Sequence, residues 1–172
     1  MKKTTALLGG GVFVLSFALA GCGGAGEETQ AADAISRAML AEADEDMVIE
    51  QEQADCVGEG LVDAIGVEQL KEYGILTDGG GAADSPLDGV TMNEGDADDA
   101  AAVMVDCLDA EAMMAEELGA DEEMTEEQRA CVQEVMDAAA LERTFSLTLQ
   151  GREDEAGQEL LAPMMDCLLG DL

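Results

Sequence analysis

The chain has 172 residues, of which 40 are aspartate or glutamate, seven are lysine or arginine and none is histidine, so its formal net charge is −33. This charge excludes nucleic acid as a partner, because binding to phosphate needs lysine and arginine. The lack of histidine also argues against nucleophilic catalysis of the usual kind, which needs a histidine base. The hydrophobic fraction of 48% is normal for a globular protein, and the length fits one domain.

The first residues have the pattern of an export signal. Lys2 and Lys3 precede a weakly polar to apolar run over 6–20, and small residues precede Cys22. A positive start, a short apolar stretch and small residues before a cleavage site are typical of such signals. The run is about 15 residues long, shorter than the roughly 18 to 20 residues that cross a bilayer. We therefore predict that residues 1–21 are a signal peptide.

The tetrapeptide Leu19-Ala20-Gly21-Cys22 resembles the lipobox of bacterial lipoproteins. The resemblance implies that the Cys22 sulfur carries a diacylglycerol, with palmitate-like chains as the whole membrane anchor, since two acyl chains hold a protein durably. It also implies a lipid-anchored position on the extracytoplasmic face of the cell membrane. Gly23, where the enterobacterial retention signal has aspartate, favours an outward-facing surface position. We expect a flexible lipidated tether over 22–30 and an acidic helical domain over 31–172.

Apolar residues recur at helical spacing along most of this domain, which predicts an all-α fold. The expected helices are, in chain order, 31–43, one from Cys56 to Ile65, 67–73, one from Thr91 or Asp96 through Cys107, 110–118, one from Thr125 through Ala139, and 155–169. Glycines and Ser85-Pro86 predict a loop over 77–90. Capping boxes are expected at Thr91 with Glu94 and at Thr125 with Gln128.

Four cysteines follow Cys22, and their even number in an exported chain is typical of disulfides, because that compartment is oxidising. They are Cys56, Cys107, Cys131 and Cys167. Zinc would use close cysteine pairs or histidines, and the sequence has neither. Only two aromatic residues, Tyr73 and Phe145, follow the signal peptide, so we expect a thin core that needs covalent support.

An internal duplication suggests how these cysteines pair. Gln53-Ala54-Asp55-Cys56-Val57 aligns with Gln128-Arg129-Ala130-Cys131-Val132, and residues 102–108 align with 162–168. The halves would span 46–109 and 121–172, each with an early and a late cysteine. The simplest of the three pairings joins Cys56 to Cys107 and Cys131 to Cys167, and each bond would contribute about 3 to 4 kcal/mol by restricting the unfolded chain.

The same duplication decides between two interpretations of residues 145–149. Phe145, Leu147 and Leu149 alternate as they would in a strand. The matching place in the first half is the expected short helix 67–73, so we predict a helix here too.

Candidate chemical sites are weak. The loop from Asp84 to Gly89 begins like an EF-hand, but Pro86 and Gly95 stand at ligand positions. A denser acidic cluster, made of Glu94, Asp96, Asp98 and Asp99, is expected to be a solvated helix start, because acids are favoured there. The eleven methionines are expected to fill the core rather than to bind copper.

The sequence therefore predicts a surface-exposed, membrane-anchored lipoprotein that acts as a non-enzymatic interaction or envelope module, without a cofactor. Its expected partner, besides the membrane, is a basic protein or a cationic wall component. The alternative is a lipoprotein that binds a small solute or a cation such as calcium. The pattern of a lipobox followed by cysteine-containing helical halves resembles small lipoproteins of high-GC Gram-positive bacteria, which implies a location and no activity.

Overall fold

The computed structural model describes residues 24–43, 49–83, 87, 89–110, 112–114 and 124–170. The predicted all-α fold is confirmed, since regular structure in these ranges is helical apart from an isolated bridge between Leu76 and Ala82. The helices are α1 (Gly24–Glu42), α2 (Gln51–Ile65), α3 (Val67–Glu72), α4 (Glu94–Leu108), α6 (Glu126–Val135), α7 (Ala138–Leu149) and α8 (Glu153–Leu169). None of the helices in this part of the chain has the length and apolar character that a membrane span requires.

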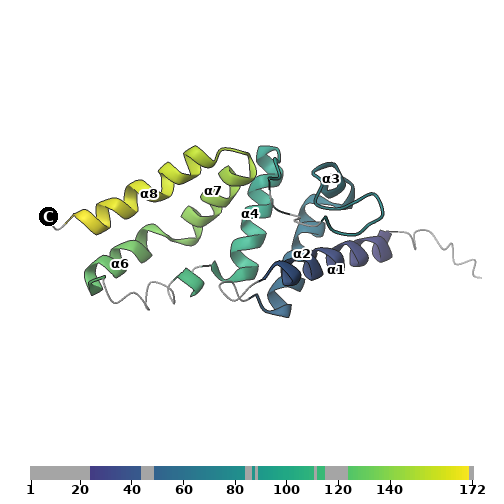
Figure 1. The fold of residues 1–172 in the computed structure, drawn as a ribbon, viewed down its shortest axis with the longest axis horizontal. Coiled ribbons are helices and arrows are strands. Elements are labelled where there is room, and N and C mark those ends of the chain that lie inside the picture. The colour runs from purple at the N-terminus through teal and green to yellow at the C-terminus, as the bar shows by residue number, and fades with distance from the viewer. Residues whose placement is uncertain are drawn as a thin grey trace, which may run out of the picture.

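The helices pack in a row rather than around one centre. Helix α1 packs on α2, α2 on α4, α4 on α7, and α7 on α8, which also contacts α6 (Figure 1). Helix α1 lies toward one end of the long axis, and α6 and α8 lie at the other (Figure 1). The buried apolar residues form two clusters, one mainly between α1 and α4 that also includes Leu149 of α7, and one that joins the end of α4 to the second half. Helix α4 therefore links the two cores.

Helices α1 and α2 approach closely because small residues face each other. A Cβ atom on Gly58 would lie 2.5 Å from the backbone oxygen of Ala32, closer than any stable contact allows. A Cβ atom on Gly60 would lie 2.6 Å from a methyl group of Val103 on α4. Glycines that weaken α2 as an isolated helix are thus what lets it pack between two neighbours.

The expected flexible tether over 22–30 is wrong for most of its length. Helix α1 begins at Gly24, seven residues before the predicted start at Ala31. The first turn is held by Glu27, whose carboxylate lies 2.7 Å from the Lys71 ammonium on α3. This hydrogen bond raises the pKa of Lys71. Residues 22 and 23 lie outside the described ranges.

The start of α4 also differs from the prediction. The capping residue is Asn93, whose side-chain oxygen accepts a hydrogen bond from the Asp96 N–H at 3.1 Å. The predicted capping box at Thr91 is therefore wrong. The adjacent Met92 is buried, and its N–H donates to the Leu149 carbonyl at 2.7 Å, so the chain remains bound to α7 until Asn93.

The single helix expected from Thr125 through Ala139 is wrong, because α6 ends at Val135 and Asp137 caps the start of α7 by accepting from the Ala140 N–H at 2.8 Å. Two other expectations hold. The capping box formed by Thr125 and Gln128 is confirmed, and residues 145–149 are helical within α7. Ile75 and Leu76 fold back on α3, where both N–H groups donate to the Leu70 carbonyl. The predicted linking helix 110–118 is helical at Ala110 and 112–114, and its remainder lies outside the described residues.

The close crossing of α1 and α2 makes Gly58 intolerant of a side chain. Gly58→Ala should destabilise the protein by about 1–3 kcal/mol, because the new methyl group forces the helices apart. Gly157→Ala is the matched control, since Gly157 lies within α8 with nothing within 4 Å of its Cβ position. It should stabilise by up to about 1 kcal/mol through helix propensity. Urea unfolding curves measure both, and equal stability of the two variants would contradict this packing.

Candidate functional site

The four cysteines pair as the duplication predicted. Cys56 of α2 is bonded to Cys107 of α4, with their Cα atoms 5.5 Å apart. Cys131 of α6 is bonded to Cys167 of α8, with their Cα atoms 5.6 Å apart. Each bond joins an early turn of one helix to the last turn of its neighbour. The two helices of each pair therefore run antiparallel.

A glutamine three residues before the first cysteine of each pair binds both helices of that pair. The Gln53 side-chain oxygen accepts from the Glu50 N–H at 3.0 Å, and its amide nitrogen donates to the Leu108 carbonyl at 3.0 Å. Gln128 makes the same two contacts, with the Thr125 N–H at 3.0 Å and the Leu168 carbonyl at 3.1 Å. We call one disulfide with its glutamine a clasp. The repeated clasp supports the internal duplication.

The clasp has a simple physical purpose. The first N–H groups and the last carbonyls of a helix lack partners within that helix. Each glutamine supplies an acceptor to the start of its own helix and a donor to the end of the neighbouring one. The repeated Gln-x-x-Cys spacing was the sequence signal for this role, and sequence reasoning had used it only to align the halves.

Two buried serines make a second recurring contact. Ser36 of α1 donates its hydroxyl hydrogen to Asp55 of α2, and Ser146 of α7 donates to Asp98 of α4. The side-chain amide of Gln51 donates to the Ser36 oxygen, and that of Gln150 donates to the Ser146 oxygen. The hydroxyls are thus occupied between packed helices, and neither serine lines one of the grooves described below.

The acidic cluster at the start of α4 does not converge on one point. Asp96 accepts hydrogen bonds from the Tyr73 hydroxyl at 2.6 Å and the Asn93 amide at 2.8 Å, whereas Asp98 accepts from Ser146. Within the described ranges, no three acidic or cysteine side chains are arranged to hold a metal ion. Of the EF-hand-like loop, residues 84–86 and 88 lie outside those ranges.

Tyr73 is the only tyrosine in the chain, and its surroundings keep it protonated. Burial raises the pKa of its phenol, and the hydrogen bond to Asp96 raises it further. Both effects raise the pKa, because burial disfavours the charged phenolate and the Asp96 carboxylate disfavours a second negative charge beside it.

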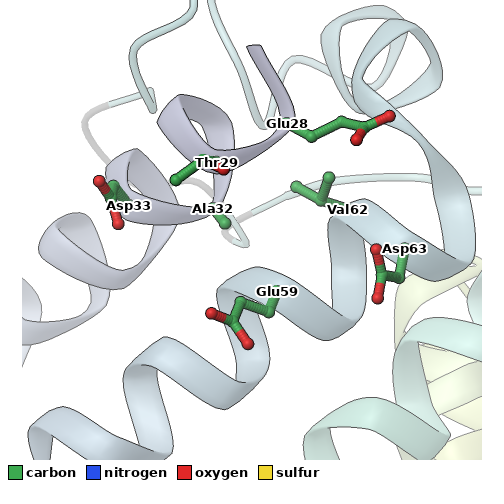
Figure 2. Close-up of a pocket in the computed structure, with 7 residues that line it drawn as sticks. All are labelled: Glu28, Thr29, Ala32, Asp33, Glu59, Val62 and Asp63. Carbon is green, nitrogen blue, oxygen red and sulfur yellow. The ribbon is translucent and has the colours of Figure 1, made fainter. Parts of the chain in front are cut away.

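An acidic concave surface lies between α1 and α2. This groove of about 270 Å³ is lined by Glu28, Thr29, Ala32, Asp33, Glu59, Val62 and Asp63. Figure 2 shows carboxylates of both helices around it, with Ala32 and Val62 between them. No lysine or arginine lines it, so we call it the acidic groove. A neighbouring groove of about 360 Å³ shares Glu28 and is also lined by Glu27 and Glu68.

The acidic groove suits a cationic group that is larger than a bare ion. Its carboxylates come from two helices and do not form a three-ligand metal set. An ammonium or guanidinium group on a longer molecule can contact several such carboxylates through separate hydrogen bonds. Sequence reasoning missed this groove, because its residues are ordinary exposed helix positions until α1 crosses α2.

Comparison with known proteins adds no relative. No protein-family model matches the chain, and no curated protein or solved structure matches it either. Of the predicted site residues, the four disulfide cysteines are placed, and Cys22 lies outside the described residues.

The environment of Tyr73 gives a pH prediction. The folded pKa of Tyr73 lies above the ordinary value near 10. The protonated phenol and its hydrogen bond to Asp96 therefore stabilise the fold below pH 10, and this stabilisation is lost as the pH rises through the folded pKa. Ultraviolet absorbance of tyrosinate should therefore titrate above pH 10 in the folded protein. Asp96→Asn should move the midpoint toward 10 without reaching it, because burial remains.

Asp99→Asn is the matched control for that experiment, since Asp99 is exposed one helical turn after Asp96 and the substitution removes the same charge. It should leave the Tyr73 midpoint in place. Equal shifts in the two variants would show that overall charge, rather than the hydrogen bond, acts on the phenol.

Proposed function

We propose that this chain is a lipid-anchored protein of the extracytoplasmic face of the cell membrane that binds a cationic partner through its acidic body and catalyses no reaction. The anchor rests on the lipobox at Cys22 and the signal-like residues before it. The single observation that carries the binding role is the acidic groove, whose walls hold Glu28, Asp33, Glu59 and Asp63 and no basic residue.

The start of α1 at Gly24 supports a particular arrangement of this partner. Two residues span at most about 7 Å of extended chain, so a lipid on Cys22 would hold α1 close to the membrane surface. Glu28 and Asp33 lie within the first three turns of that helix. The cationic partner would therefore approach near the membrane, as a basic protein segment or an amine-bearing wall polymer can.

Two other functions receive less support. Calcium prefers six to eight oxygen ligands, and the described residues bring no three acids together for it. For hydrolysis, the two buried serines would have to reach a substrate, but both are hydrogen-bonded between helices away from the grooves. These observations favour binding over catalysis, and a larger cation over a metal ion.

The test uses a penta-lysine peptide and isothermal titration at low ionic strength, where charge contacts are least screened. Glu59→Gln with Asp63→Asn should weaken binding about fivefold, since two partly exposed ion pairs contribute about 1 kcal/mol together. The control variant, Asp99→Asn with Glu134→Gln, removes the same charge from exposed positions outside the grooves. It should change the affinity less than twofold.

Equal weakening by the two double variants would mean that overall charge attracts the peptide and that the groove is not a site. Calcium binding at micromolar concentration, with loss of peptide binding, would favour the cation-binding alternative instead.

A further inference from the structure

Helix α8 exposes a row of large apolar side chains. Leu161, Met165 and Leu169 are 59%, 49% and 50% exposed. Because they are four residues apart, they lie along one side of the helix. We call these three residues the α8 stripe. Neighbouring large apolar side chains on an exposed helix side are typical of interaction surfaces, whereas scattered single ones are not.

The internal duplication shows what such a row does elsewhere in this protein. Aligning Cys167 with Cys107 places Leu161 on Ala101, Met165 on Val105 and Leu169 on Asp109, the exposed C-cap of α4. Ala101 and Val105 are 0% and 4% exposed. The positions of Leu161 and Met165 are thus buried in the first half and open in the second.

Helix α7 covers this side of α4. Val105 belongs, with Leu141 of α7, to the buried cluster that joins the end of α4 to the second half. The Ser146 hydroxyl of α7 also donates a hydrogen bond to Asp98 on α4. The same alignment places the exposed Gln158 of α8 on Asp98. Figure 1 shows α7 between α4 and α8, with α8 at the outer edge. Leu161 and Met165 of the α8 stripe therefore match the side of α4 that packs against the amphipathic helix α7.

Helix α8 has leucine and methionine where α4 has the smaller alanine and valine. This side of α8 has therefore kept the apolar character of an internal interface, although it is exposed here.

Charge indicates which helix would bind there. Glu155 and Glu159 of α8 already pair with Arg152 and Arg143 of this chain. The negative charge that faces a partner on this side comes from the exposed Asp154, seven residues before Leu161, and from Asp166, next to Met165. A second copy would bring the same carboxylates and a net charge of −33, and its own α7 is occupied by its α4.

We propose that the α8 stripe is a docking surface for an amphipathic helix of another protein, with leucine-like residues on one side and lysine or arginine beside them. This goes beyond the acidic groove, because it uses the opposite end of the molecule. Specificity would come from the apolar contacts, and the carboxylates would favour a basic helix over an acidic one.

The probe is an 18-residue synthetic peptide of leucine and lysine at amphipathic helical spacing, added to the full chain and followed by fluorescence anisotropy. A scrambled peptide of the same composition keeps the charge and lacks the apolar side. Met165→Gln should weaken binding of the amphipathic peptide about tenfold, because a methionine loses its apolar contact. Met113→Gln is the matched control, since Met113 is 40% exposed outside the stripe, and it should change the affinity less than twofold.

Two outcomes would overturn the proposal. Equal binding of the scrambled and amphipathic peptides would show that charge alone attracts them. Self-association of the full chain that Met165→Gln abolishes would show that a second copy covers the stripe. Both glutamine variants should keep the wild-type melting midpoint within about 2 °C, because the positions are exposed.

The acidic groove provides a separate check. In the Glu59→Gln/Asp63→Asn background, any binding of the lysines to the groove is already weakened, so Met165→Gln should still cost about tenfold in affinity for the amphipathic peptide. Loss of the Met165→Gln effect in this background would contradict docking on α8 and would assign the peptide to the groove.

Discussion

The disulfide in each clasp, with its glutamine, is the constraint on which the rest of this structure depends. Buried residues of the first core are alanine and aliphatic side chains or methionine, and the second core has four buried members in the described ranges. The two disulfides join cysteines that are 51 and 36 positions apart in the sequence. Each contributes about 4 kcal/mol to stability by restricting the unfolded chain. That contribution is large beside the roughly 5 to 15 kcal/mol that stabilises a typical domain. Small, acidic helices can thus pack with only Tyr73 and Phe145 as aromatic residues at the edges of the two cores.

The duplication explains both the order and the asymmetry of the molecule. One clasp holds α2 to α4, the other holds α6 to α8, and α7 joins the halves by packing on α4. Helix α1 covers α2 at one end, where its crossing creates the acidic groove. The opposite end presents the α8 stripe. The two candidate surfaces therefore lie at opposite ends of the row of described helices (Figure 1).

Sequence patterns predicted what depends on local periodicity and covalent chemistry. Helical spacing predicted the fold, and the repeated segments around Cys56 and Cys131 predicted both disulfides. The same repeat predicted a helix where Phe145 alternates with leucines. Features that depend on distant partners were not predictable. Asn93 caps α4 directly after Met92, which is bound to α7, and Glu27 in the first turn of α1 pairs with Lys71 of α3. The grooves arise from how helices cross, which no single segment encodes.

The most direct measurement is tryptic peptide mapping, without reduction, of protein recovered from its own cells. Trypsin cleaves after the few lysines and arginines, so each disulfide cysteine falls on a separate peptide, namely 38–71, 72–129, 130–143 and 153–172. The account predicts 38–71 linked to 72–129, 130–143 linked to 153–172, and an acylated Cys22. A bond between the halves, such as 38–71 with 130–143, or free thiols at these cysteines, would contradict the duplicated clasp.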